Sequence, residues 1–561
     1  MGLFGAIQTA NSGLIAAQLG LQVVGNNIAN ANTPGFIRQR LELTPNVATG
    51  QGQLLVGRGV RATGVVQIID KALAERVYQA STAVAGGDTL GKAYNQLEEL
   101  VGTLDDSGIR SRFTLFNNSL NDLSTQPADR SLRDFVVLQG DALAKSIRTT
   151  YQQAVDRQSD FNTDLAGQAK QINRQLERIA DLNVQISTLE GGGAVGSDAS
   201  GLREQRYSAI EELSKFVDLN IQEQASGSIS VFVGGDYLVA DGNHREVYTA
   251  SDPEKGGLEV RIRETDSALQ STGGVFGATV QAKNEVFGGF LKDLDNLAGG
   301  LIRAVNEVHS QGQGRVGFDK LVSANKGQSG VPLRDAGLPF SPTNGTFEIS
   351  VLDAAGNVVS KKSIAVRSLN QVGDSTLGSV AADIDSIDGL SASINAEGRL
   401  SISSDPQVSF VFGQDTSEFL SAVGVNTFFV GTNANEIAVN DTVKNKSDYL
   451  AISQGGVGRD TKAITSLVDL IDKPLDSLAG QSVRGIFDSN VASLGQKTSL
   501  QKSITDGARS FYDTLVSQHL AITGVNIDEE SLKLINYNKA FQASARVISV
   551  ANEMLDLLVK L

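Results

Sequence analysis

The residue types that carry most enzymatic chemistry are scarce in this chain. Its 561 residues include no cysteine, and its three histidines, His244, His309 and His519, lie far apart in the sequence. Without cysteine there is no thiolate ligand for zinc or an iron–sulfur cluster, and no thiol nucleophile. Three scattered histidines offer little for acid–base catalysis or a zinc centre. We therefore expect no catalytic residue, no metal site and no cofactor.

Two strings look like ligand-binding motifs but lack the surroundings that those motifs need. Gly191-x-Gly193-x-x-Gly196 matches a dinucleotide fingerprint, yet it follows a helical stretch instead of a strand, which favours a flexible linker. The acidic string from Asp383 to Gly389 begins like a calcium loop, but it has one residue too many and no glutamate at the required place. We interpret it as an acidic turn, and His519, in a helical stretch, as a packed histidine.

Composition and charge narrow the choice of partners. The chain has 48 Lys and Arg against 63 Asp and Glu, a net charge of −15, which argues against nucleic acid or an anionic membrane surface as partner. No apolar run reaches the ~18 residues of a membrane-spanning helix. The first charged residue is Arg38, so the basic start of a cleavable secretion signal is missing. If the protein is secreted, we expect a route that does not read such a signal.

The first 28 residues predict a helix with an apolar seam. Apolar residues recur there at alternating steps of four and three, the pattern of a coiled coil. The seam residues are Ile7, Ala10, Leu14, Ala17, Leu21, Val24 and Ile28. Glycines at 5, 13, 20 and 25 each cost a helix ~1 kcal/mol relative to alanine, so this helix needs neighbours to be stable.

The last residues, from about 528 to 561, predict a second helix of the same kind. Asp528, Glu529 and Glu530 fall in its first turn, where the helix dipole favours acidic side chains. Its apolar seam consists of Leu534, Phe541, Ile548, Leu555 and Leu558. Two seams of similar period at opposite ends of one chain predict that the two helices pair.

Both ends also resemble a known family. Residues 26–36, Asn-Asn-Ile-Ala-Asn-Ala-Asn-Thr-Pro-Gly-Phe, are similar to the N-terminal signature of bacterial flagellar rod, hook and hook-associated proteins. Residues 524–530 and 537–545 resemble the tail of the hook-associated protein 1 family, where rod and hook proteins tend to read Ser-Asn-Val-Asp/Asn-Leu. Residues 202–206, Leu-Arg-Glu-Gln-Arg, are similar to an internal stretch of the same family.

The resemblance implies a structural subunit that joins the flagellar hook to the filament. Such a subunit is exported unfolded and assembles at the distal end of the hook, as part of the extracellular flagellum. The implied partners are further copies in a helical ring, the hook protein, hook-associated protein 3, and an export chaperone at the C-terminal helix. The alternatives are a hook or distal-rod subunit, or a secreted enzyme or adhesin on a flagellin-like frame with its activity in residues 331–450.

The most specific string is a candidate assembly motif made of Asn30, Asn32, Thr33, Pro34, Gly35 and Phe36. The asparagines tolerate a left-handed helix cap, and Pro34 keeps Thr33 out of the helical region, so the first helix should end here. Thr33–Phe36 fits a type II turn, with proline second and glycine third. The turn either only stops the helix or aims this segment at neighbouring subunits, and the resemblance favours the second reading.

The whole pattern predicts an α+β multidomain protein, in which paired N- and C-terminal helical, coiled-coil layers carry inserted β-rich domains. We expect a terminal assembly domain (1–70 with 525–561), a helical rod domain (71–190 with about 275–310 and 455–524), a small mixed α/β region (191–274) and a β-rich outer domain (331–454). Residues 312–330 read as a Gly/Ser/Lys/Gln-rich linker, and Asn395–Gly398 as a hairpin turn. Ile504, Ala508, Phe511 and Leu515 share one helix face.

Overall fold

The computed structural model describes residues 3–51, 54–102, 108–190, 198–251, 257–474 and 480–560. It divides into two compact units, each assembled from segments that are distant in sequence. Unit 1 comprises residues 1–93, 159–283 and 499–561, and unit 2 comprises residues 94–158 and 284–498. The Gly191–Gly196 string lies outside the described residues.

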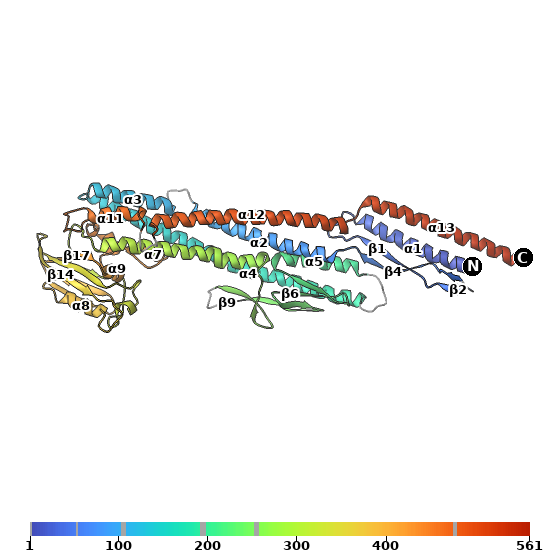
Figure 1. The fold of residues 1–561 in the computed structure, drawn as a ribbon, viewed down its shortest axis with the longest axis horizontal. Helices are drawn as coiled ribbons and strands as arrows, with labels where there is room; N and C mark the ends of the chain where they lie inside the picture. Colours follow the sequence, from blue (N-terminus) through green and yellow to red (C-terminus); the bar gives the residue numbers. More distant parts are fainter. Residues whose placement is uncertain are drawn as a thin grey trace. The chain divides into compact units, whose positions relative to one another are not determined.

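In unit 1, helices α1 (Leu3–Ala29) and α13 (Ile527–Lys560) lie side by side (Figure 1). The predicted terminal helices and their pairing are therefore confirmed. Between α1 and the next helix, strand β1 (Gln39–Pro45) pairs antiparallel with β4 (Val60–Gln67), and β2 (Thr49–Gln51) pairs with β3 (Leu54–Val56).

The rest of unit 1 packs helices against two small sheets. Its helical part comes from α5 (Ser200–Phe216) and α6 (Gly274–Gln281) together with parts of α2 (Lys71–Val101), α4 (Arg130–Glu190) and α12 (Val483–Thr523), whose other parts belong to unit 2. One sheet has the order β5-β6-β7-β8 and the other β11-β10-β9. Their strands are β5 (Asn220–Glu223), β6 (Ile229–Val233), β7 (Asp236–Ala240), β8 (Asn243–His244), β9 (Val247–Ser251), β10 (Leu258–Ile262) and β11 (Ser267–Ala268). A row of apolar residues on α4, spaced by seven, is buried: Leu165, Ile172, Ile179 and Ile186. The first three share an apolar core with residues of these sheets.

Unit 2 has a helical part with its own apolar core. It contains α3 (Ile109–Thr125), the first half of α4, the π-helix η1 (Ala282–Phe287), α7 (Gly288–Ser310) and α11 (Lys462–Asp472). A turn connects α3 to α4, since the Asp129 N–H donates to the Gln126 carbonyl at 3.1 Å. Phe428 and Phe429, far along the chain, are buried in the same core.

The β-rich part of unit 2 surrounds a second core. Its sheets have the orders β14-β13-β17, β12-β16-β15 and β18-β19. The strands are β12 (Lys320–Val322), β13 (Gly345–Leu352), β14 (Val358–Val366), β15 (Leu390–Ile394), β16 (Leu400–Ser404), β17 (Ser409–Asp415), β18 (Phe429–Val430) and β19 (Ala438–Val439). Short helices accompany them: η2 (Leu333–Asp335), α8 (Leu377–Asp385), α9 (Phe419–Val423), α10 (Asp441–Asn445) and η3 (Ser447–Tyr449). The predicted hairpin turn joins β15 to β16, with Gly398 at a φ of +78°.

One local prediction is wrong. Residues 312–330 are not a free linker, because Phe318 and Leu321 are buried in the core of the β-rich part and β12 pairs with β16. On α12, Leu515 is buried, but Ile504 and Phe511 are about half exposed, at 56% and 52%. Their spacing places them on the helix face that carries Leu515, which is buried in a small core with Leu73, Val77 and Ala80.

The α+β fold class with terminal helices and inserted β sheets is confirmed. The four-domain division stays a prediction. Within the described residues, no helix is both long and apolar enough to cross a membrane.

Candidate assembly site

The terminal coil, formed by α1 and α13, has one antiparallel register. The Asn27 amide donates to Glu530 Oε2 at 2.9 Å. A Cβ placed on Gly20 would lie 2.5 Å from the Tyr537 ring, and one on Gly13 would lie 3.0 Å from the Ser544 hydroxyl. Each step of seven residues down α1 therefore matches a step of seven up α13, which fixes how the two helices meet.

Small residues occupy the centre of this contact. The buried residues of α1 are Ala10, Ala16, Ala17, Gly20, Val23, Val24 and Asn27. Of the predicted seam, Ala10, Ala17 and Val24 are thus buried, whereas Ile7, Leu14, Leu21 and Ile28 are only half-buried. Glycine and alanine let the backbone of α1 approach the large side chains of α13 closely, which the apolar period alone does not reveal.

On α13, four of the five predicted seam residues lie where they can contact other residues. Leu534, Phe541, Ile548 and Leu555 are half-buried, but Leu558 is 59% exposed. The register explains this correction, because α1 begins at Leu3 and has no residue that could lie opposite Leu558. The prediction extended the seam by one turn too many.

A buried polar cluster closes the coil near the end of α1. Glu530 is fully buried, where it accepts from Asn27 and from the Lys533 ammonium, the latter at 2.7 Å. Asn27 also bonds both backbone groups of Gln39, accepting its N–H at 3.0 Å and donating to its carbonyl at 2.9 Å. One asparagine thereby joins α1, α13 and β1, and a buried charge that loses such partners is costly.

The candidate assembly motif follows directly and has the predicted turn. Gly35 has a φ of +79°, and the Phe36 N–H donates to the Thr33 carbonyl at 3.2 Å, as in a type II turn. Asn30 bonds back to the Asn26 carbonyl and to Thr33, which ends the helix. Asn32, Thr33, Pro34 and Gly35 are exposed, while Phe36 is half-buried. The turn geometry is confirmed; a role in assembly stays a prediction.

Helix α5 holds the chain that leaves this turn. Glu204 accepts from the Ile37 N–H at 3.2 Å and from the Gln67 amide at 3.1 Å. Burial raises the pKa of Glu204 above its ordinary value, although both hydrogen bonds favour the charged form. The Gln39 amide donates to the Ser200 hydroxyl at 2.9 Å. The start of α5 thus fixes the segment between the motif and β1.

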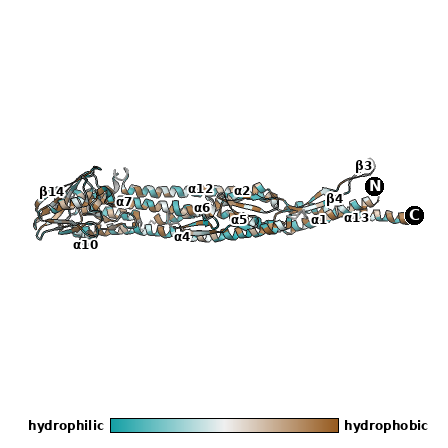
Figure 2. Cartoon of the chain, turned by 90° about the horizontal axis from the view of Figure 1, so that it is seen from below, coloured by the Kyte–Doolittle hydropathy of each residue, from teal (hydrophilic) through white to brown (hydrophobic). Residues whose placement is uncertain are grey.

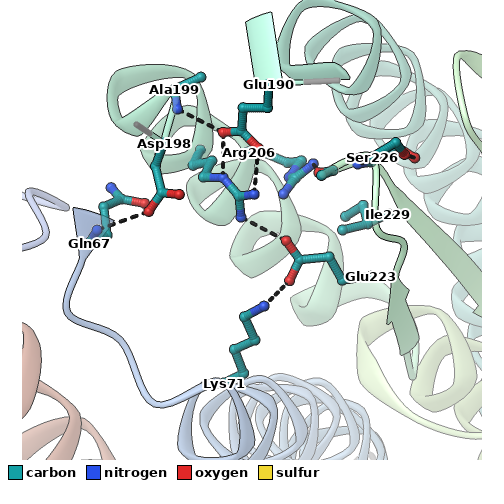
Figure 3. Close-up of polar contacts among 12 residues, drawn as sticks. Gln67, Lys71, Glu190, Asp198, Ala199, Arg206, Glu223, Ser226 and Ile229 are labelled. Atoms are coloured by element: carbon teal, nitrogen blue, oxygen red, sulfur yellow. Dashed lines mark hydrogen bonds and ion pairs between the residues drawn. The ribbon is translucent and has the colours of Figure 1, made fainter. Parts of the chain in front are cut away.

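The two arginines of the internal Leu-Arg-Glu-Gln-Arg string lie on α5 and form polar contacts with other elements of unit 1 (Figure 3). Arg203 bridges Glu190 at 2.6 Å and Glu223 at 2.7 Å, and Lys71 also pairs with Glu223. Burial alone would raise the pKa of Glu190, but hydrogen bonds from Arg203 and the Ala199 N–H outweigh it and hold the pKa below its usual range. The network ties α2, α4, α5 and β5 together around one guanidinium.

Arg206, one turn further along α5, is almost fully buried. It donates to the Asn183 side-chain oxygen at 2.9 Å and to the Gly227 carbonyl at 2.7 Å. Both acceptors are neutral, and among the described residues no carboxylate lies within hydrogen-bonding distance of Arg206. Burial lowers the pKa of its guanidinium. Its contacts are internal, so we assign it a structural role.

A groove of about 910 Å³ opens beside the assembly motif, entirely within unit 1. Its lining includes Phe36 and the tyrosines Tyr78, Tyr207 and Tyr512. His519 also lines it, and its Nε2 atom is enclosed without a hydrogen-bond partner among the described residues. Aromatic side chains with polar tips are typical of surfaces that bind other proteins.

His309 and the acidic string have ordinary structural surroundings. His309 is fully buried; its Nδ1 lies 2.8 Å from the Asn426 carbonyl, and its Nε2 accepts the Ala451 N–H at 3.0 Å. Burial lowers its pKa to about 4, so it is neutral at pH 7. Asp385 accepts the Ala392 N–H at 2.9 Å. Among the described residues, no group of three or more His, Asp and Glu could hold a metal ion.

Sequence reasoning missed several residues of this site, above all Asn27, Gln39, Glu204 and Glu530. Asn27 and Glu530 do lie inside the two strings that carry the family resemblance. For Glu530 the available signal was a polar residue four positions before the seam residue Leu534, because polar residues at contact positions fix register in coiled coils. Asn27 lies between the seam residues Val24 and Ile28 and gave no such signal. Glu204 gave no signal in the sequence beyond its place in the internal string.

Comparisons with known proteins match these elements. A family model described as the flagellar hook-associated protein FlgK helical domain matches residues 94–320. A flagella basal body rod protein model matches residues 7–36, and a model of the C-terminal part of the flagellar basal body rod FlgEFG proteins matches residues 516–561. The chain is 25% identical to flagellar hook-associated protein 1 of Salmonella typhimurium, over 99% of both chains. It is 31% identical to the protein of that name in Bacillus subtilis, over 55% of this chain and 68% of the relative.

A solved structure, titled as the flagellar hook junction protein FlgK from Burkholderia pseudomallei, matches with a TM-score of 0.53 at 15% identity. The match covers 80% of this chain and 100% of that one, and it supports the fold. The two terminal matches define the class, that of flagellar axial proteins. Within it, the chain belongs to the flagellar hook-associated protein 1 family. It is a structural flagellar protein and not an enzyme.

Proposed function

We propose that this chain is the structural subunit that joins the flagellar hook to the filament, exported as an unfolded chain and assembled at the distal end of the hook. The observation that carries the proposal is the match along 99% of both chains to relatives named hook-associated protein 1. A rod protein, FlgG of Caulobacter vibrioides, matches only 18% of this chain. A hook or distal-rod subunit therefore has less support.

The proposed partners are further copies of the chain, the hook protein and hook-associated protein 3. The outer face of α13 supports association beyond α1, because it carries a second set of exposed apolar side chains. Figure 2 shows how apolar and polar residues alternate along this helix. These residues are 43–63% exposed: Leu532, Ile535, Val547, Val550, Met554 and Leu557. Val550 lies two residues, or about 200°, from the inner-seam residue Ile548, so the second stripe faces away from α1.

An export chaperone at α13 is part of the proposal. A helix with apolar residues on two faces can bind in an apolar groove of another protein, and its apolar surface must be shielded from solvent before assembly. Only Glu530 and Ala551 of α13 are buried in the monomer, so most of its surface is available to a chaperone or to neighbouring subunits.

The test is removal of the protein from a flagellated strain. We expect cells that build hooks without filaments and release filament subunits into the medium, with motility restored by the intact chain. Hooks that still carry stable filaments would contradict the proposal, and loss of the hooks themselves would favour a rod or hook subunit.

A further inference from the structure

The two ends of the terminal coil differ in a way that suggests how copies meet. Where α1 begins, Phe4 is 76% exposed, and Leu557, Leu558 and Val559 at the end of α13 are 63%, 59% and 86% exposed. We call these four residues the apolar end. The antiparallel register places them together, and Figure 1 shows both termini at this end of the pair.

The opposite end of the coil carries the groove. The register pair Asn27 and Glu530 lies there, and residues 30–37 and 523–525, which continue from α1 and precede α13, line the groove. With 27 residues in α1, the two ends are about 40 Å apart. One coil thus has an exposed apolar surface at one end and an aromatic groove at the other.

The chemistry of the groove suits that apolar end. The hydroxyls of Tyr78, Tyr207 and Tyr512 form no hydrogen bond with any other described residue, and Val77 and Leu520 also line the walls. Burial raises the pKa of Tyr78 far above its ordinary value, so it stays neutral. Apolar side chains can bury against these rings while the polar tips bond to backbone groups at a helix end.

Charge is also consistent with this pairing. Residues 3–37 contain no charged side chain, and neither do Leu557, Leu558 and Val559. The exposed rim of the groove, from Asn32 to Gly35, is likewise uncharged. The charged residues that line the groove are Arg178, Glu204 and Glu211, and Glu204 is already bonded to Ile37 and Gln67.

We propose that the groove receives the apolar end of a second copy of this chain. The contact is head-to-tail, since it joins two different surfaces, and head-to-tail contacts generate rings or helical assemblies. The proposal rests on the proposed function, in which copies associate around the hook tip. It assigns the assembly motif a specific task, which is to form the rim of the receiving groove.

Cysteine cross-linking tests the contact directly, because the native chain has no cysteine. In flagella carrying Leu557→Cys together with Ser208→Cys, a short bis-maleimide should produce a ladder of multimers. Ser208 is exposed and lines the groove, and a link within one chain is prevented by the length of the coil. The control pair, Leu557→Cys with Thr114→Cys, places the second thiol at an exposed site in unit 2 and should give no ladder.

A charge variant provides the second measurement. Phe4→Asp should lower incorporation into flagella by roughly tenfold or more, since a charge would be buried among the tyrosines. Asn11→Asp, at an exposed position of the same helix, should incorporate normally. Both variants should be secreted in equal amounts.

The outcomes separate the contact from the function. Ladders of equal strength in both cysteine pairs, or no ladder from protein that is present at the hook tip, would overturn the groove contact and leave the proposed function standing. Protein absent from the flagella of an otherwise normal strain would overturn both.

Discussion

At the scale of single residues, the conformation of Gly35 decides the shape of the assembly motif. Its φ of +79° is unfavourable for a β-branched residue, and nothing lies within 4 Å of a Cβ placed there. Gly35→Val should therefore cost about 1–3 kcal/mol through backbone strain alone. We expect export and folding of unit 2 to survive while stable filaments become rare, counted by electron microscopy.

Two variants control this prediction. Gly57→Val introduces the same side chain into open space at a residue without positive φ, and it should assemble normally. Gly35→Asn should recover part of the filaments, because asparagine tolerates positive φ better than valine. Normal filament numbers in the Gly35→Val strain would show that the turn serves only to end α1.

Because His309 is buried in its neutral form, we expect acid to destabilise unit 2. Its Nε2 accepts the Ala451 N–H, so Nδ1 carries the proton and protonation of Nε2 would remove that acceptor. Because its pKa is about 4 when folded and about 6.5 when unfolded, the unfolded state binds more protons between these values. The free energy of unfolding should fall by about 3 kcal/mol as pH drops from 7 to 4.

Urea denaturation of native protein and of His309→Gln at both pH values measures this contribution. The variant should be less stable at pH 7 but should lose less stability on acidification, since other acid-sensitive groups are common to both proteins. An equal loss in both proteins would mean that His309 does not carry the effect.

At the scale of elements, some features could be predicted from the sequence and others could not. The period of apolar residues predicted α1 and α13, and Pro34-Gly35 predicted the turn. The same period included Ala10 and Ala17, which are buried, but not Gly20, which is also buried and faces the Tyr537 ring. Long-range contacts such as Glu204 with Ile37 have no local signature, since a hydrogen bond between distant segments leaves no periodicity.

The close approach at Gly20 gives a prediction for the coil. A methyl group there would collide with the Tyr537 ring, so Gly20→Ala should weaken the pairing of α1 and α13 despite its higher helix propensity. Gly25→Ala is the matched control: the same change on the same helix, with nothing within 4 Å. It should stabilise α1 by up to ~1 kcal/mol.

Incorporation into flagella and amide exchange of α13 would compare the two variants. Tyr537→Ser should restore pairing when combined with Gly20→Ala, because it removes the clashing ring. Gly20→Ala that behaves like Gly25→Ala would contradict the register.

The β-rich part of unit 2 should be separable from the helices, provided that the deletion spares the residues that belong to the helical core. Deleting 331–450 would remove Phe428 and Phe429, which are buried in the helical core. We propose instead to replace residues 316–424 by a short loop. The Asn426 amide donates to the Gly312 carbonyl at 2.9 Å, so the two ends of the deletion are close.

We expect the shorter deletion to keep the helical circular-dichroism signal of the intact chain and to assemble, because the terminal coil lies outside it. The 331–450 deletion should unfold unit 2 and lose its cooperative transition. Equal behaviour of the two deletions would refute this boundary.

At the scale of the whole molecule, the chain combines segments common to flagellar axial proteins with a domain of its own family. Residues 7–36 and 516–561 match rod protein models, and they form the terminal coil and much of the groove. Residues 94–320 match the hook-associated protein FlgK helical domain. We infer that the shared ends provide assembly and that the central domains set the place in the flagellum.

The most direct test of this account is the position of the protein on isolated flagella. Immunogold labelling of a copy tagged in the exposed loop at Val372 should place gold in a single band at the boundary between hook and filament. Gold distributed along the filament, confined to the rod, or absent from flagella that still carry filaments would contradict the central claim.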